Sequence, residues 1–518
     1  MEPTRKLTPT NTEPIISPSG KWLEFNRWPP ARFSPDSGAE SIAVGENHHH
    51  IPIKMGEFDQ NPSFPSLPLS DDRVDRVGSE RALSSQVNPT GRYNQFQRTM
   101  LQWSSLHPYN AVHVVQIGRL IDPVHFGERL NHVLTLCGLG NLTIDSKGGF
   151  FRFHGGNPEC IPKFLDGGSD PIAALYHEME CQLNDVFHFD RPFTPFRFFL
   201  LSTGGESFVG ISYFHAVADA ESITRLLVEI VRASFDDSPQ PIRDNTLRPS
   251  GEGRLPTEGP LAAVRRSWSA LARIQAMRSS FRPPRCEITD LRNEFSGVSL
   301  NCEETAELLA TAREWGLTIN DLCLASLLLA LAPVTPGRFL ESRPRLSVGC
   351  VVNLRNDLAP KKRNYFGLFL GSFAVSHEVE GEVSLRELAN SVRAQTLAIK
   401  KRKLYLAASL EFMISRFLFG RTSREKQCNF YRKSYPLWGS ITNMKMDELC
   451  SNLDVAPIRD YYRAVSAGPA MPLVIAVTGV AGHLNFGASY RPTTLPATEV
   501  EGIMDRFISQ LKKAGGKA

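Results

Sequence analysis

The chain has 518 residues, more than one hydrophobic core usually serves, so its length predicts two lobes or domains. Its composition, with 42% hydrophobic and 22% charged residues, is that of a globular protein. The formal net charge of +4 is small for this length and argues against a nucleic-acid-binding protein.

The cysteines and the apolar runs indicate the compartment. Nine cysteines are scattered without a C-x-x-C pair, which predicts reduced thiols rather than a disulfide or zinc framework. The stretch MEPTRKLTPTNTEPIISPSG lacks the apolar region of a signal peptide. The longest apolar run, Leu322 to Val334, is too short to cross a bilayer. We therefore expect a soluble, cytoplasmic protein with no transmembrane segment.

Residues 1–88 are rich in Pro, Ser, Asp and Asn and show no sustained apolar period. This composition predicts a largely disordered N-terminal extension. The extension contains His48, His49 and His50, but three adjacent side chains on a flexible loop form a poor chelate, so we assign no metal site.

The next part of the chain, 89–235, alternates strand and helix patterns and is predicted to form a first α/β lobe. Asp122 is a candidate N-cap for its first helix and Gly138 a candidate stop. The predicted elements are a strand in 110–121, a helix in 122–138, a strand in 150–156, a helix in 170–187 and a hairpin in 196–217.

Residues 236–285 are polar and rich in Pro and Gly before a basic helix, which is typical of a crossover between lobes. A second lobe is predicted for 286–518. Two similar lobes leave a cleft between them, where ligands usually bind. The clearest elements of the second lobe are a helix pair in 302–332, strands in 345–355, 370–379, 472–479 and 483–490, and a last helix in 499–514.

The segment ISYFHAVADAESITRLLVEI, 211–230, carries the clearest candidate chemistry. A strand ends at Phe214, His215 follows at once, and Asp219 stands directly before an amphipathic helix. A histidine in such a short loop can present one ring nitrogen to a substrate while the other bonds a backbone carbonyl. This suits proton removal from a hydroxyl or amine. Two structural interpretations stay open, an N-cap role for Asp219 and a core role for His215.

The segment resembles the HxxxD active-site motif of the coenzyme-A-dependent acyltransferase superfamily. That superfamily includes plant BAHD acyltransferases, nonribosomal-peptide condensation domains, polyketide-associated acyltransferases, alcohol acetyltransferases and wax ester synthases. Other segments agree with it in order and spacing, so that the resemblance covers about residues 90–515. They are HPYNAVHVVQIGRLIDPVHFGERLNHVL (107–134), VFHFDRPFTPFRFFLL (186–201), LTINDLCLASLLLAL (317–331), VVNLRNDL (351–358) and GSITNM (439–444).

The resemblance implies an α/β fold of two chloramphenicol acetyltransferase-like lobes with a central channel. It implies that His215 is the general base on an alcohol or amine acceptor, which attacks an acyl thioester. Asp219 is then a structural residue that points away from the channel and pairs with Arg355. No metal or redox cofactor is implied. The co-substrate is acyl-CoA or a phosphopantetheine thioester, and an acyl carrier protein is a candidate partner.

Two further groups are candidates by position. Asn443, Ser440 and Thr442 are candidates to stabilise the negative charge of a tetrahedral intermediate, or they simply end a strand. Lys361, Lys362 and Arg363 are candidates for the phosphates of the donor, although such basic runs are usually solvated faces.

The sequence departs from the superfamily pattern at two positions of the motif. Phe214 stands where many members have a first histidine, and Ala220 replaces a glycine. The DFGWG motif of the plant family is absent. A catalytically silent binding module and an amide-forming condensation enzyme therefore remain as alternatives. The silent module would show His215 turned into the core or a blocked channel.

Overall fold

The computed structural model describes most of the chain from Thr90 to Gly516. The predicted extension at 1–88, with its three histidines, lies outside the described residues, as does most of the crossover predicted at 236–285. Within 90–516 the description omits residues 146, 148, 156–157, 237–267, 270–271, 273, 286, 288, 361–362, 364, 408–410, 412, 414–415, 418–421, 452 and 469–470.

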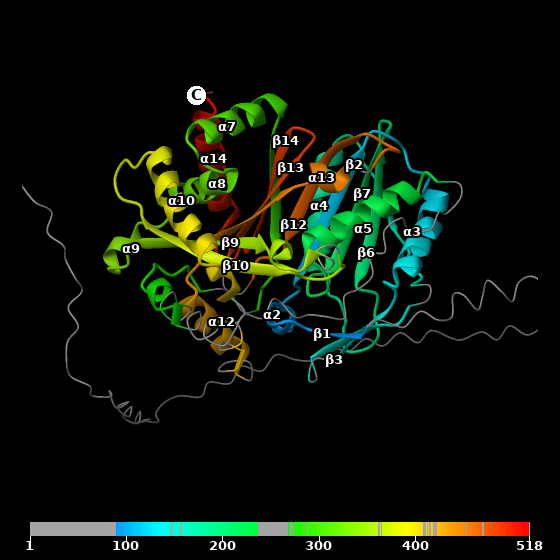
Figure 1. Cartoon of the computed structure of the whole chain (residues 1–518), viewed down its shortest axis with the longest axis horizontal. Helices are drawn as coiled ribbons and strands as arrows, with labels where there is room; N and C mark the ends of the chain where they lie inside the picture. The colour runs from blue at the N-terminus through cyan, green and yellow to red at the C-terminus, as the bar shows by residue number, and fades with distance from the viewer. Residues whose placement is uncertain are drawn as a thin grey trace, which may run out of the picture. The chain divides into compact units, whose positions relative to one another are not determined.

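The first lobe is built on a five-stranded sheet with the strand order β12-β2-β7-β6-β5. Helices α3 and α5 cover one face, where they contact each other, and α4 covers the other (Figure 1). The strands are β2 (Asn110–Ile117), β5 (Lys163–Asp166), β6 (Phe196–Thr203), β7 (Glu206–Phe214) and β12 (Ile458–Val465), and the helices are α3 (Pro123–Cys137), α4 (Pro171–Asn184) and α5 (Ala220–Ala233).

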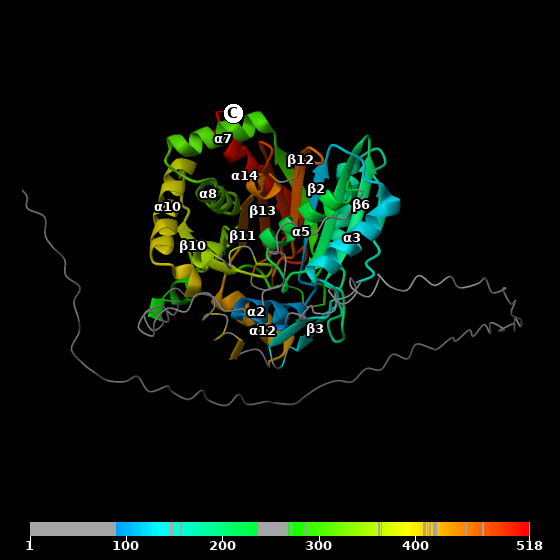
Figure 2. The same cartoon turned by 45° about the vertical axis from the view of Figure 1, so that its right-hand side comes forward.

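The second lobe is built on a six-stranded sheet with the strand order β10-β9-β11-β13-β14-β8. Helices α8, α10 and α14 pack together over it, as Figure 2 shows beside β13. Its strands are β8 (Glu294–Leu300), β9 (Arg345–Asn353), β10 (Leu370–Glu378), β11 (Gly439–Lys445), β13 (Leu473–Val480) and β14 (His483–Tyr490), and its helices are α7 (Cys302–Glu314), α8 (Ile319–Leu331), α10 (Leu385–Lys401) and α14 (Ala497–Ala514).

Smaller elements accompany the two large sheets. A third sheet, with the order β1-β4-β3, was not foreseen beyond its strand β4. These elements are β1 (Thr90–Arg92), β3 (Leu142–Asp145), β4 (Phe150–Phe153), α2 (Gln95–Ser104), α9 (Gly337–Leu340), α12 (Arg424–Ser434), α13 (Asp447–Cys450) and the 3-10 turns η2 (Arg355–Asp357) and η4 (Leu404–Ala407).

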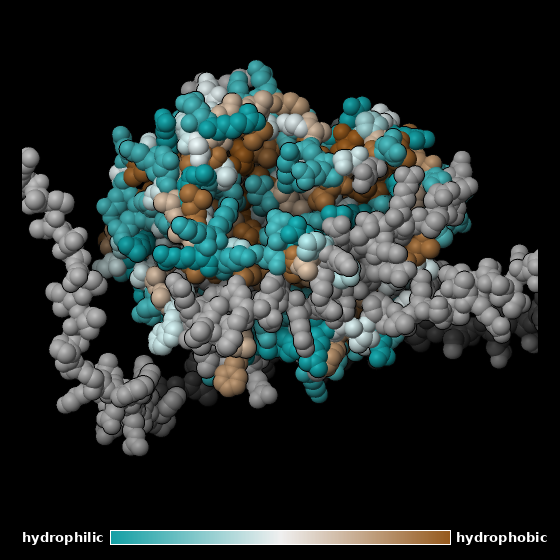
Figure 3. Space-filling model, in the orientation of Figure 1, coloured by the Kyte–Doolittle hydropathy of each residue, from teal (hydrophilic) through white to brown (hydrophobic). Residues whose placement is uncertain are grey.

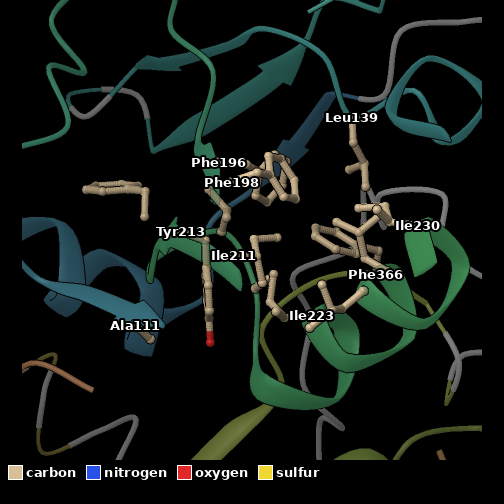
Figure 4. Packing of buried hydrophobic residues seen from close by; sticks show 14 of the residues in the cluster. Ala111, Leu139, Phe196, Phe198, Ile211, Tyr213, Ile223, Ile230 and Phe366 are labelled. Carbon is tan, nitrogen blue, oxygen red and sulfur yellow. The ribbon is translucent and has the colours of Figure 1, made fainter. Parts of the chain in front are cut away.

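Helix α5 shows why the predicted elements form where the sequence indicated them. Asp219 caps its first turn by accepting the Ser222 N–H, and its apolar residues recur at helical spacing. Ile223 and Ile230 enter the core beside Ile211 and Phe366, as Figure 4 shows. The two-lobed α/β fold predicted from the sequence is confirmed, and α14 begins two residues earlier than predicted.

The boundary predicted at residue 286 does not separate the sheets. β12 comes from the second half of the chain, yet it pairs antiparallel with β2 and forms the edge of the first lobe's sheet. The predicted boundary is therefore wrong for β12. The sequence pattern of a strand shows that it is a strand, but not which strand it will pair with. Because β12 lies in the first lobe's sheet, the backbone hydrogen bonds of β12 connect the two lobes.

The approach of β14 to β12 requires a glycine. A Cβ added at Gly487 would lie 2.2 Å from the carbonyl oxygen of Arg463, far inside contact distance. We expect Gly487→Ala to lower the free energy of unfolding by about 1–3 kcal/mol, because the backbone of β12 would have to move. Urea unfolding measures this. Gly479→Ala on β13 is the matched control, since its nearest neighbour would lie at 3.6 Å. Equal stability of the two variants would contradict the prediction.

On the face shown in Figure 3, hydrophobic surface gathers along the middle, between the more hydrophilic surfaces to either side. In the described part of the chain no single helix is long and apolar enough to cross a membrane. Among the described helices, α7 and α8 taken together, which meet at 99°, satisfy that test by length and composition.

Candidate active site

His215 is the first residue after β7, at the start of the tight connection to α5. Its backbone N–H donates to the carbonyl of Tyr109, and its ring stacks on the Tyr109 ring with centroids 5.7 Å apart. The ring atom Nδ1 lies 3.3 Å from the carbonyl oxygen of Ala218. A carbonyl only accepts, so Nδ1 carries the proton and Nε2 keeps its lone pair. Within the described residues Nε2 makes no hydrogen bond.

Burial controls the protonation of His215. The pKa of the imidazole is lowered from 6.5 to about 4, mainly by burial and in smaller part by the nearby Arg463, against the opposing effects of the Ala218 carbonyl and Asp219. The ring is therefore neutral at neutral pH, the form in which Nε2 can accept a proton.

This pKa predicts how acyl transfer through His215 would depend on pH. A base with a pKa of about 4 stays unprotonated well below pH 6.5. With an alcohol acceptor, which does not itself titrate in this range, we therefore expect kcat/KM to remain level down to about pH 5 and to fall as the pH drops through 4. An inflection near pH 6.5 would contradict it.

The stability of the fold needs a parallel measurement. Below pH 6.5 the unfolded chain takes up a proton at His215 that the folded chain does not, so the free energy of unfolding declines between pH 6.5 and 4. Unfolding curves at each pH separate this loss from a loss of catalysis.

Asp219 is buried at the start of α5 and serves two structural purposes. Its Oδ1 accepts the N–H of Ser222 at 2.9 Å, which caps the helix. Nη2 of Arg355 donates to both carboxylate oxygens, at 2.8 and 2.9 Å. The Phe369 N–H donates to Oδ2 at 3.0 Å, and the Asp219 N–H donates to Gly367. The capping and ion-pair interpretations of Asp219 therefore hold together.

Arg355 reaches Asp219 from the 3-10 turn η2, which follows β9 in the second lobe. The two side chains are 4% and 2% exposed, so the pair is removed from solvent. Nη1 of Arg355 donates to the carbonyls of Arg363 and Tyr365, at 2.5 and 2.9 Å. The loop that carries His215 is thus held by a residue of the opposite lobe.

Phe214, which stands where many HxxxD proteins have a histidine, lies on the other side of the strand end. Its ring packs among Phe187, Phe189 and Phe193, with centroid distances from 5.2 to 6.1 Å. It does not line the cavity that His215 lines. Within the described residues Phe214 is part of the first lobe's core.

His215 lines a cavity of about 780 Å³ whose wall comes from both lobes. The second lobe's sheet opens at this place. β11 pairs with β9 only from Gly439 to Ile441 and then continues along β13, while β9 continues along β10 to Asn353. Residues beyond the split, including Thr442 and Asn443, line the cavity.

The structure brings the three oxyanion candidates, Ser440, Thr442 and Asn443, to this cavity with His215. The Ser440 hydroxyl is buried and has no hydrogen-bond partner among the described residues. Of the donor-phosphate candidates, the structure describes Arg363 alone. Lys361 and Lys362 lie outside the described residues, and Arg363 is exposed and does not line the cavity. The described residues also include no group of three or more His, Cys, Asp or Glu side chains placed to hold a metal ion.

Sequence reasoning missed many polar residues of the wall, and three of them, His113, Tyr213 and Arg463, lie close to one another. His113 lies opposite Arg463 across the β2–β12 pairing, and the Tyr213 ring meets the ring of His113 edge-on, with centroids 5.7 Å apart. His113 and Tyr213 are polar residues inside largely apolar strands, which is the signal that could have marked them. Arg463 gave no such signal, because its strand also contains Arg459 and Asp460.

Two α/β lobes that share a strand, with a cavity lined from both lobes, form a fold that is also seen in solved structures of condensation domains. The first condensation domain of the CDA synthetase is 14% identical, with a TM-score of 0.59 over 83% of this chain and 97% of that one. The EpoB cyclization-docking bidomain from Sorangium cellulosum is 12% identical, with a TM-score of 0.58 over 82% of this chain and 84% of that one.

A third similar structure is a mutant of the starter condensation domain of rhizomide synthetase, in complex with C8-CoA and Leu-SNAC. It is 13% identical, with a TM-score of 0.56 over 86% of this chain and 97% of that one. No family model matches the chain, and no curated protein matches its sequence. These likenesses concern the fold.

Proposed function

We propose that the protein is an acyltransferase that moves an acyl group from a thioester donor, acyl-CoA or carrier-bound, to an alcohol or amine acceptor. One observation carries this proposal. The Ala218 carbonyl orients the His215 ring so that Nε2 keeps its lone pair, in a cavity walled by both lobes. Such a histidine can act as a general base.

The proposed reaction needs only the two substrates and His215. Nε2 accepts the proton of the acceptor's hydroxyl or amine as its oxygen or nitrogen bonds to the thioester carbon. The tetrahedral intermediate then collapses, the carbon–sulfur bond breaks, and the leaving thiolate takes the proton back from Nε2. Ser440, Thr442 and Asn443 are the candidates to stabilise the oxyanion, because they line the same cavity.

The alternatives differ in what they predict. A catalytically silent module would have His215 turned into the core or its channel blocked, whereas His215 lines an open volume of about 780 Å³. An amide-forming condensation enzyme would use the same base on an amine, with carrier-bound substrates. The class of acceptor that supports turnover separates it from an ester-forming enzyme.

The test is the release of free thiol from short and long acyl-CoA and acyl-SNAC donors, each with pooled alcohols, with pooled amines and with no acceptor. Mass spectrometry identifies the ester or amide. We expect release that depends on an acceptor and yields a new acyl product. No acceptor-dependent release from CoA, SNAC and carrier-protein donors alike would reject the proposal in favour of the binding module.

A further inference from the structure

Arg463 is a buried cation in the wall of the cavity. It lies in the middle of β12 and is 2% exposed. Its Nε donates to the Thr478 hydroxyl at 2.8 Å, and its Nη2 donates to the carbonyls of Thr442 and Val477 at 2.9 and 2.7 Å. All these acceptors are neutral. Burial lowers the pKa of Arg463 to about 10, so it remains charged at neutral pH.

The charge of Arg463 has no counter-ion in the described part of the chain. No carboxylate lies within 4.0 Å of it, and Nη1 makes no hydrogen bond there. The other arginine among the described wall residues, Arg345, pairs with Glu378 at 2.8 Å. Asp219 and Glu221, the carboxylates next to the HxxxD loop, are engaged by Arg355. Buried charges are normally paired, so Arg463 has an unmet requirement for an anion.

A second hydrogen-bond donor of the wall is also unused. The Tyr213 hydroxyl is buried and has no partner among the described residues. Its ring meets the His215 ring edge-on, with centroids 5.5 Å apart, so it stands next to the proposed base. In Figure 4 its hydroxyl extends away from the packed side chain of Ile211. The charge of Arg463 acts on this hydroxyl and on His215.

His113 is paired with Arg463 on the neighbouring strand β2 and lines the same cavity, where it is a neutral hydrogen-bond acceptor. Thr224 donates to the Ala220 carbonyl at 2.8 Å, so the Tyr461 hydroxyl donates to Thr224 and His113 Nδ1 donates to Tyr461. This leaves the Nε2 lone pair of His113 without a partner in the described chain. His113 therefore adds no negative charge that could neutralise Arg463.

We propose that Arg463, with the Tyr213 hydroxyl, binds a free carboxylate on the acyl acceptor, so that the acceptor is an amino acid or a hydroxy acid. The acceptor is the substrate whose reacting atom must touch His215, and Arg463 lies in the wall near that histidine. A carboxylate would give the buried guanidinium its missing counter-ion in a site of low dielectric. The assignment of the carboxylate to the acceptor rests on the proposed acyl transfer. The binding of a carboxylate by Arg463 does not depend on acyl transfer.

The test measures equilibrium binding on the full chain carrying His215→Ala, which removes turnover. Amino acids and hydroxy acids are compared with their primary amides, using the fluorescence of Trp103, which lines the cavity, or calorimetry. We expect at least one acid to bind ten or more times tighter than its amide. Arg463→Gln should abolish this ratio and Arg463→Lys should keep part of it. Arg345→Gln, at the paired arginine, should leave it unchanged.

The acid-to-amide ratio measured with Arg463 intact does not depend on whether a variant folds. This matters because Arg463 also joins the two sheets, so its variants are compared only after their unfolding midpoints are known. A ratio near one across the panel would overturn the inference, as would a ratio that survives in folded Arg463→Gln. A clear ratio without acyl transfer would support this site and count against the proposed function. Transfer to neutral acceptors with no preference for acids would support the proposed function and count against this site.

Discussion

Replacing His215 by alanine should lower the acceptor-dependent rate of thiol release by about 10²- to 10⁴-fold, the usual contribution of a general base. The loss should appear in kcat, because the base acts on the proton that moves in the transition state. His215→Gln should be equally slow, since an amide cannot accept that proton at neutral pH. Steady-state kinetics with the acceptor found in the panel measures both variants.

The control is His154→Ala, an exposed histidine at the end of β4, far along the chain from the HxxxD loop. It should keep the full rate. Both His215 variants should unfold near the wild-type midpoint, because the only side-chain hydrogen bond of His215 in the described chain is the 3.3 Å contact with Ala218. Undiminished turnover in folded His215→Ala would reject this histidine as the base.

Breaking the ion pair between Asp219 and Arg355 should cost about 3–5 kcal/mol of folding stability from either side, because the remaining partner is left buried and unpaired. We expect Asp219→Asn and Arg355→Met each to show this loss. The double variant should cost much less than the sum of the two, since neither unpaired charge remains. Denaturant unfolding of all four proteins in the cycle gives the coupling energy.

The same variants show whether Asp219 affects activity by holding the loop that carries His215 or by taking part in catalysis. Asp219→Asn should lose activity through movement of the loop that carries His215, so its activity and stability should recover together when a stabilising ligand is bound. Arg225→Ala is the matched control, because its bond to Glu221 at 2.9 Å is more exposed and should be worth less than about 1 kcal/mol. Additive losses in the Asp219 and Arg355 cycle would contradict a coupled pair.

Sequence pattern was enough to locate most of the helices and strands. Each depends on local chemistry that is visible in the chain, such as the Asp122 cap and Gly138 stop of α3 or the helical spacing after Asp219. The order of the motifs indicated the two-lobed fold, because that order reflects strand and helix succession. The pairing of Asp219 with Arg355 came from the resemblance, since the two residues are 136 positions apart and share no local pattern.

By itself, the sequence of this protein determined the succession of its elements, the HxxxD loop and the absence of a strong overall charge. Only the tertiary structure decided that β12 joins the first lobe's sheet, that β9 and β11 separate to open the cavity, and that Phe214 belongs to the core. It also placed Arg463, which has no counter-ion among the described residues, near the base. The reason is physical, because strand pairing and burial of charge depend on residues far apart in the chain, whereas caps and periodicity depend on near neighbours.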